Sequence, residues 1–190
     1  MTSSRFQVRP LGPGDAAAFQ AFRLRALREA PEAFGSTYEE EADLPLDTVA
    51  GLLAPADGPA QVVLGAFSEG IQDGEALVGM VVCHRERRTK ARHRASIGGM
   101  FVAPEARGLG IGRALLERVV AEARSWPGVE KLTLTVVERA AAARALYHAV
   151  GFRRYGLEPD SLRQDGVRDT VEYMALELEA APGGGPSGAG

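Results

Sequence analysis

The segment from Val102 to Glu117, VAPEARGLGIGRALLE, carries the residue types and spacing best suited to binding chemistry. Its glycines, Gly108, Gly110 and Gly112, occupy alternate positions and lead directly into a helical pattern. Glycine costs about 1 kcal/mol relative to alanine inside a helix, so this spacing indicates a turn that needs bare backbone. Unpaired amides at a helix start, together with the positive end of the helix dipole, bind phosphate groups. The segment therefore predicts an anion-binding turn.

Two common phosphate-binding motifs do not fit this segment. A Walker-type loop has Lys followed by Ser or Thr after its last glycine, whereas Gly112 is followed by Arg113 and Ala114. A dinucleotide fingerprint has G-x-G-x-x-G early in a βαβ unit, whereas these glycines come late, after a run of strands. A tight turn in which glycine serves packing alone stays open as an alternative. Arg107 and Arg113 bracket the glycines with positive charge and favour an anion.

The rest of the chain alternates between strand and helix patterns that would position this turn. Apolar residues at every second position predict strands, and apolar residues three or four positions apart predict helices. The expected strands are residues 5–11, 60–70, 75–86, 93–104, 130–138, 152–159 and 168–179. The expected helical regions are residues 15–30, 36–58, 110–124 and 139–151. This order predicts an α/β fold with a mixed sheet and helices on both faces.

Local signals set several helix ends. Asp15 is predicted to cap the first helix, and the Ala30–Pro31 step is predicted to end it. Pro45 is expected to break the second helical region. Gly151 is expected to follow the end of the last helix in a left-handed conformation.

Composition limits the classes of function. A chain of 190 residues suits one domain, which we expect over residues 1–179, and the Pro/Gly-rich residues 180–190 are expected to be a disordered tail. The net charge of −3 gives no reason to expect nucleic acid or an anionic membrane as a partner. Cys83 is the single cysteine and the three histidines lack metal-site spacing, so we predict no disulfide and no metal. No signal-peptide or membrane-span pattern occurs, which predicts a cytoplasmic protein.

Two motifs resemble the GCN5-related N-acetyltransferase (GNAT) superfamily. RGLGIG, residues 107–112, matches its signature Q/R-x-x-G-x-G/A, and the preceding MFVAPEA looks like its fourth strand and V-x-P turn. ARALYHAVGF, residues 143–152, is similar to its second signature, A-x-x-L-Y-x-x-x-G-F. The resemblance covers roughly residues 5–179. It implies a GNAT fold, with a central mixed sheet of six to seven strands, about four flanking helices and a splay between the fourth and fifth strands.

The resemblance also implies an enzyme that moves an acetyl group from acetyl-CoA directly to a primary amine in a ternary complex. In the family, the strand before the glycine loop pairs with the pantetheine arm, and the loop wraps the pyrophosphate. The residues that would offer backbone groups to the arm are Met100, Phe101 and Val102. The residues that would hold the pyrophosphate, mostly through amides, are Arg107, Gly108, Leu109, Gly110, Ile111, Gly112 and Arg113. An amide near Phe101 or Val102 is expected to stabilise the oxyanion.

Tyr147 is the candidate catalytic residue, because in the family the tyrosine of the second signature lies beside the acetyl-CoA sulfur. A phenol with a pKa of about 10 is suited to protonating a thiolate whose conjugate acid has a pKa of about 8.5. The alternative is a half-buried tyrosine that only packs. Two positions depart from the family pattern: Ala140 replaces a cofactor-contacting Asn, and Thr135 replaces a Glu that acts as base in some relatives.

The motifs do not identify a general base, although an alkylamine with a pKa of about 10.4 must lose a proton before it attacks. The candidates are a water chain and the side chains of Glu39, Glu40, Glu41 and Glu138. The first three lie in the region that lines the acceptor pocket in the family, and an acidic run there would attract a cationic amine. The alternative for these three is a solvated helix face.

Other readings stay open. An acyl-CoA-binding sensor or assembly module without turnover is an alternative that Ala140 and Thr135 support, and a module that binds ATP or NAD at the glycine loop is another. The acceptor is an amine of a small molecule or a protein, and homodimers are common in the family. The Arg-rich turn between His84 and His93 is most simply a solvated hairpin connection, with contact to a phosphate or an acidic partner as the alternative.

Overall fold

The alternating apolar segments form one seven-stranded sheet in the computed structural model, which describes residues 6–54, 61–72, 74–164 and 166–178. The strands are β1 (Phe6–Pro10), β2 (Gln61–Gln72), β3 (Gly74–Arg85), β4 (Arg94–Val102), β5 (Lys131–Val137), β6 (Arg153–Gln164) and β7 (Val167–Glu177). They are ordered β1-β2-β3-β4-β5-β7-β6, and all neighbours are antiparallel except β4 and β5. The predicted mixed sheet is confirmed, and the expected tail lies outside the described residues.

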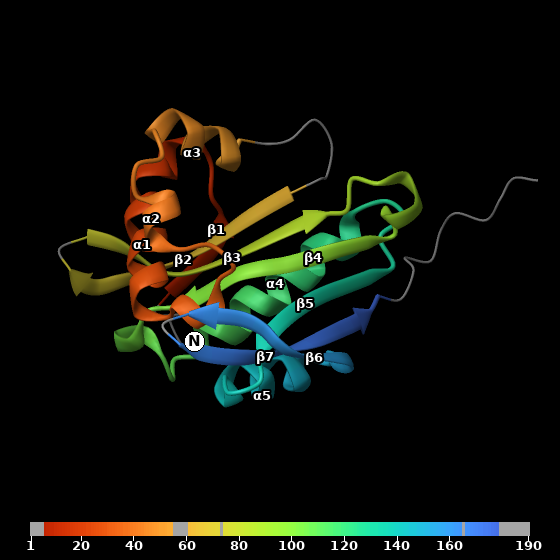
Figure 1. Cartoon of the computed structure of the whole chain (residues 1–190). Coiled ribbons are helices and arrows are strands. Elements are labelled where there is room, and N and C mark those ends of the chain that lie inside the picture. The colour runs from red at the N-terminus through yellow and green to blue at the C-terminus, as the bar shows by residue number, and fades with distance from the viewer. Residues whose placement is uncertain (1–5, 55–60, 73, 165, 179–190) are drawn as a thin grey trace, which may run out of the picture.

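Helices cover both faces of this sheet (Figure 1). The α-helices are α1 (Ala16–Glu29), α2 (Tyr38–Glu41), α3 (Leu46–Leu53), α4 (Ile111–Ser125) and α5 (Ala141–Val150). Four short 3₁₀ turns are η1 (Pro13–Asp15), η2 (Pro31–Ala33), η3 (Thr89–Ala91) and η4 (Pro104–Ala106). In Figure 1, α1 and α2 lie in front of the sheet, and α4 lies behind it. None of the helices in the described ranges has the length and apolar character needed to cross a bilayer.

The predicted helix ends are confirmed with one correction. Pro45 precedes α3 and separates it from α2, and Gly151 follows α5 with a φ of +114°. α1 begins directly after Asp15, but the Asp15 carboxylate does not cap it. The carboxylate instead accepts a hydrogen bond from the Gly12 amide at 2.9 Å and pairs with Arg9 at 2.8 Å. The capping prediction was wrong because Pro13–Asp15 form a 3₁₀ turn, and Asp15 closes that turn.

The core packs α4 against the sheet. Leu115, Leu116 and Val119 on one face of α4 are fully buried, as are Met80 of β3 and Leu132 of β5. Burial of one such side chain contributes about 1.5–3 kcal/mol relative to its exposure. α4 is therefore a rigid support for the glycine loop that precedes it.

The parallel pair β4 and β5 separates partway along its length. The last residues paired between the two strands are Ile97 and Leu134. β4 then continues to Val102 and β5 to Val137 without further pairing to each other. β4 has an irregular register with β3 at this point, where Gly99 has a φ of +59°. Such a bulge bends a strand away from its regular course. The predicted splay between the fourth and fifth strands is confirmed.

Candidate active site

The splay leaves the second half of β4 with an open edge toward β5. The Ala103 amide donates to the Val78 carbonyl at 2.9 Å, so the backbone of Ala103 faces β3. Because backbone groups alternate in direction along a strand, Phe101 also faces β3, while the N–H and C=O groups of Met100 and Val102 face the splay. The geometry thus favours Met100 and Val102 as the residues that offer backbone groups to a ligand.

Phe101 belongs to the core rather than to the open edge. Its side chain is 4% exposed, and its ring lies 5.5 Å from that of Phe22 and 6.5 Å from that of Phe34, between centroids. Its amide points toward β3, because backbone groups alternate in direction along β4. Of the two amides expected to stabilise an oxyanion, that of Val102 is the one facing the splay.

The loop between β4 and α4 holds two of its glycines in the left-handed region. Gly108 and Gly110 have φ values of +76° and +82°, and a Cβ on either would meet no atom within 4 Å. Backbone conformation rather than crowding therefore requires glycine at these two positions. Gly112 differs, because it lies in α4 and a Cβ there would come within 3.2 Å of Leu146 Cδ2. The packing alternative thus applies to Gly112, and Leu109 is 43% exposed between the left-handed pair.

Backbone amides without an acceptor in the helix lie at the start of α4, directly after the loop. Gly110 occupies the N-cap position, and Ala114 donates to the Gly110 carbonyl at 3.0 Å. The amides of Ile111, Gly112 and Arg113 precede this bond, so they have no acceptor within the helix. The positive end of the α4 dipole lies at the same place. Amides and dipole together make this turn suited to a phosphate group.

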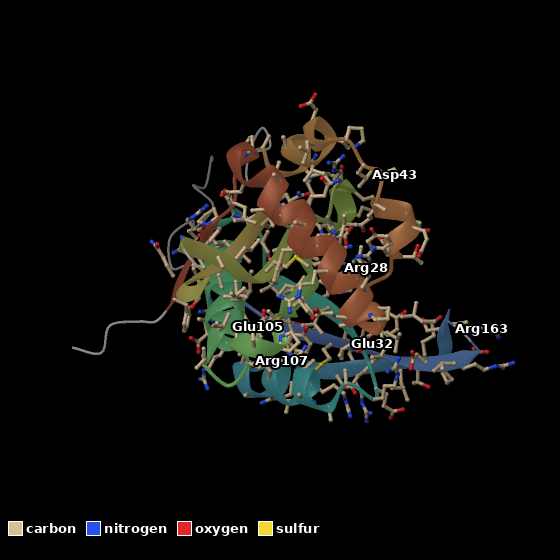
Figure 2. All side chains as sticks on the ribbon, turned by 90° about the vertical axis from the view of Figure 1, so that its left-hand side faces the viewer. Arg28, Glu32, Asp43, Glu105, Arg107 and Arg163 are labelled. Carbon is tan, nitrogen blue, oxygen red and sulfur yellow. The ribbon has the colours of Figure 1, made fainter. Side chains whose placement is uncertain are left out.

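Arg107 adds positive charge beside the loop. Its Nε donates to the Val102 carbonyl at 3.1 Å, which is one of the groups on the open edge of β4. Figure 2 shows Arg107 next to Glu105. The Glu105 carboxylate is bonded to Arg25 at 2.7 Å, and this hydrogen bond is the main reason that its pKa falls to about 2. Arg25 is shared between Glu105 and Glu29, and the charge of Arg107 also contributes to lowering the pKa of Glu105.

Arg113 is the second predicted cation at the loop and is held only loosely. It pairs with Glu117 one turn along α4 at 2.8 Å, and its side chain is 60% exposed. Exposed pairs of this kind contribute about 0–1 kcal/mol. The guanidinium group is therefore free to turn from Glu117 toward an anion at the helix start.

Tyr147 of α5 reaches the open half of β4. Its hydroxyl donates to Met100 Sδ at 3.7 Å, and its ring meets that of Phe152 edge-on, with centroids 6.1 Å apart. The side chain is 8% exposed, and this burial raises the pKa of the phenol to about 12. The phenol is therefore neutral at physiological pH and can donate a hydrogen bond. The two motifs, more than thirty residues apart in the chain, thus meet at the splay.

The four carboxylates expected as general bases are positioned differently. Glu41 accepts two hydrogen bonds from Arg23, at 2.9 and 2.7 Å, and the guanidinium group lowers its pKa. Glu40 is bonded to the backbone at the start of α2 in a capping box. Glu39 and Glu138 are exposed. Glu41 and Glu40 are engaged in local structure, which leaves Glu39, Glu138 and a water chain as the candidates for a base.

The Arg23–Glu41 pair makes stability depend on acid pH. Because the folded-state pKa of Glu41 is lowered, its contribution is present above the ordinary value of 4.5 and is lost as the pH falls through the folded value. We expect Tm to stay level between about pH 7 and 5.5 and to fall below about pH 4.5. Arg23→Gln should flatten this fall, as measured by calorimetry across the series.

Asp15 and Asp169 have lowered pKa values as well, so part of the acid loss should persist in that variant. The wild-type and Arg23→Gln curves are therefore compared by their difference. An identical fall of Tm with acid in both proteins contradicts the assignment to Glu41.

Cys83 lies in the core of the sheet, away from solvent. Cys83 on β3 is 0% exposed, and burial raises the pKa of its thiol to about 12. It is therefore not a thiolate at neutral pH. Within the described ranges, no three His, Cys, Asp or Glu residues come together as a metal-binding group.

One buried carboxylate close to the site was not predicted. Glu172 on β7 is 1% exposed, and it accepts a hydrogen bond from Arg144 Nε at 2.7 Å. Arg144 lies on α5, one turn before Tyr147. His148 Nε2 lies 3.8 Å from the other carboxylate oxygen of Glu172. The available signal was the period of two along β7, which places Glu172 in phase with the inward-facing Met174. Glu172 thus anchors the helix that carries Tyr147.

Comparison with known proteins finds one family match and several similar folds. The model of the acetyltransferase (GNAT) family matches residues 24–152, more than half of the chain. The structure of an acetyltransferase of the GNAT family from Streptococcus pneumoniae has a TM-score of 0.79 and 25% identity, over 91% of this chain and 99% of that one. A ribosomal-protein-alanine N-acetyltransferase from Brucella melitensis has a TM-score of 0.75 and 25% identity, over 90% of this chain and 99% of that one.

A more distant structure, yncA from Salmonella typhimurium, was solved with its cofactor acetyl-CoA. It has a TM-score of 0.76 over 96% of this chain and 99% of its own, at 19% identity. At that identity the similarity shows the fold, and the same fold accommodates acetyl-CoA in that protein.

Proposed function

Because the chain belongs to the acetyltransferase (GNAT) family, we propose that it is an N-acetyltransferase that moves the acetyl group of acetyl-CoA directly to a primary amine. One observation carries this proposal: the Tyr147 hydroxyl, 3.7 Å from Met100 Sδ, lies at the unpaired half of the strand that leads into the left-handed glycine loop. The tyrosine hydroxyl, the unpaired strand and the glycine loop are the three features needed to bind a ligand that has a thioester at one end and a pyrophosphate at the other. The similarity spans nearly the whole chain, so we also propose a single domain over residues 1–179.

The residues present fit acetyl-CoA as co-substrate. The pyrophosphate would lie at the loop, where a Cβ on Gly108 or Gly110 would point into open space. The loop amides and the first-turn amides of α4 supply donors there, and Arg107 and Arg113 supply charge. The backbone of Met100 and Val102 would pair with the pantetheine arm, which then acts as an added strand.

Acetyl-CoA supplies an activated acetyl group, and the chain supplies orientation, charge stabilisation and water exclusion. Binding both substrates in the splay gives the proximity advantage of an oriented pair. The Val102 amide would donate to the carbonyl oxygen as negative charge develops on it. The C–N bond forms as the C–S bond breaks, and the amine releases its proton to Glu39, Glu138 or water.

Tyr147 would act on the departing sulfur as a hydrogen-bond donor. Its pKa of about 12 lies above the value of about 8.5 for a thiol, so complete proton transfer from the phenol to the thiolate is unfavourable. A neutral phenol still donates a charge-assisted hydrogen bond to the sulfur, which stabilises the leaving group. Burial thus favours stabilisation of the thiolate over full protonation by Tyr147.

The left-handed loop provides a direct test of cofactor binding. An alanine at φ +82° costs about 1–2 kcal/mol, and its Cβ would enter the space proposed for the pyrophosphate. We expect Gly110→Ala to raise the Kd for acetyl-CoA by about tenfold or more in a calorimetric titration. Gly51→Ala in α3 is the matched control, since a Cβ there also meets nothing within 4 Å, and its Kd should be unchanged. Equal Kd values for the two variants contradict the pyrophosphate assignment.

The experiment that tests the proposed function combines binding and turnover. The protein is titrated with acetyl-CoA, with ATP and NAD in parallel, and thiol release is then followed with a panel of amines. The panel includes a peptide with N-terminal alanine, because one similar structure is a ribosomal-protein-alanine N-acetyltransferase. Selective acetyl-CoA binding with amine-dependent thiol release supports the proposal. Folded protein that fails to bind acetyl-CoA, or that binds it without release by any amine in the panel, overturns it.

A further inference from the structure

A pocket of about 730 Å³ lies at the opposite end of the sheet from the splay. It is formed where β4 and β5 begin, at the right-hand end of the sheet in Figure 1. Arg94 is the first residue of β4 and Val102 the last, so at about 3.3 Å per residue they lie about 26 Å apart. The pocket is therefore separate from the candidate active site.

The pocket is strongly cationic, although the whole chain has a net charge of −3. Its basic lining residues are Lys90, His93, Arg94, Lys131, Arg153 and Arg154. The one carboxylate among the lining residues, Glu177, pairs with Lys131 at 2.7 Å. The other four Lys and Arg side chains of the lining are not paired with Glu177. Like charges this close together repel one another. An anion with several negative charges would relieve this repulsion.

Arg94 carries a buried donor that needs an acceptor. Its Nε is enclosed, and no described residue accepts a hydrogen bond from it. Of the polar groups that follow on the same face, Ser96 Oγ and Thr133 Oγ1 are bonded to each other at 3.0 Å, and Ser96 Oγ also donates to Glu86 Oε1 at 3.2 Å, which places one carboxylate beside the pocket. Buried donors are nearly always satisfied, and leaving a charged one without an acceptor is costly. A water molecule or a ligand in the pocket is therefore expected as its acceptor.

We propose that this pocket is a second binding site, for a small ligand that carries at least two phosphate groups. Guanidinium groups form paired hydrogen bonds with phosphate oxygens, and several arginines meet here. The pocket volume lies within the range of about 300–1,000 Å³ typical of small-molecule sites. Tyr155, which is 61% exposed, adds a ring on which a base of a nucleoside diphosphate could stack.

Tripolyphosphate is the probe for this site, used in calorimetry with saturating coenzyme A so that the glycine loop is filled. We expect one probe per chain, and a Kd raised by about tenfold or more in the double variant Lys90→Ala/Arg154→Ala. Arg94→Gln should weaken binding to a similar extent. Arg87→Ala is the matched control, because it removes one charge from the same exposed loop without touching the pocket lining, and its Kd should change less than about twofold.

Circular dichroism and the acetyl-CoA titration verify that the variants are folded, since Lys90 and Arg154 are exposed. Loss of tripolyphosphate binding with an unchanged acetyl-CoA Kd supports the second site. Complete displacement of the probe by coenzyme A, or an equal loss of affinity in Arg87→Ala, overturns it. So does tight binding of a single-stranded RNA oligomer with no binding of tripolyphosphate, which would assign the pocket to a nucleic acid.

Discussion

Replacing Tyr147 with phenylalanine is expected to lower kcat for acetyl transfer by about 100-fold while leaving the Kd for acetyl-CoA within about twofold. The substitution removes the hydroxyl that lies 3.7 Å from Met100 Sδ and keeps the ring that packs on Phe152. Loss of a hydrogen bond to a charged group costs about 1.5–3 kcal/mol, which corresponds to about 10- to 150-fold in rate. The effect should therefore fall on the chemical step.

The measurement is thiol release under saturating acetyl-CoA and amine, together with a calorimetric titration of each protein. Tyr155→Phe is the matched control, because it removes a phenol hydroxyl at the opposite end of the sheet, where the side chain is 61% exposed. Its kcat should equal that of the wild type. A kcat within about threefold of wild type for Tyr147→Phe would mean that Tyr147 only packs.

Arg144→Met is expected to destabilise the protein by about 3–5 kcal/mol and to lower Tm by about 10 °C. Glu172 is 1% exposed, and its ion pair with Arg144 has an N–O distance of 2.7 Å. Removing the cation leaves a carboxylate buried without its partner, which is the costly way to break such a pair. Because Arg144 lies one turn before Tyr147 on α5, the loss should loosen the helix that carries the candidate catalytic residue.

The controls separate charge burial from simple loss of a side chain. Arg113→Met removes one partner of a pair whose side chains are 60% and 54% exposed, and it should cost less than about 1 kcal/mol. The double variant Arg144→Met/Glu172→Leu replaces the buried pair by apolar side chains and should recover most of the lost stability. Thermal and urea denaturation measure all three. If the double variant is no more stable than Arg144→Met, the buried charge is not the cause.

Most of the fold could be predicted from the sequence because its strands and helices are set by local periodicity. The C-terminal hairpin is where the prediction falls short. Residues 152–159 were expected as a strand, but β6 continues to Gln164. The register of β6 is irregular here, and Asp160 adopts a φ of +55° within the strand. A turn signal and a bulge signal use the same residue types, so the local sequence could not distinguish them.

The candidate site was predictable at positions where the backbone conformation favours a single residue type. Gly108 and Gly110 are examples, because a left-handed turn selects glycine directly. The direction of the Phe101 backbone was not predictable, since it depends on the register of β4 against β3 beyond the bulge at Gly99. The inward position of Glu172 follows from the period of two along β7, but its pairing with Arg144 was not predictable, because Arg144 lies 28 residues earlier in the chain.

The short junction between β4 and β5 has a consequence for where the sheet opens. It joins two halves of the sheet, β1-β2-β3-β4 and β5-β7-β6, each of which is built from antiparallel neighbours. The junction spans four residue pairs, which is fewer than any other pairing of neighbouring strands in the sheet. Because each ladder bond helps to hold two strands together, we expect the sheet to part most readily between these two halves. Amide hydrogen exchange along β4 and β5 would show this as weaker protection than at the antiparallel pairs.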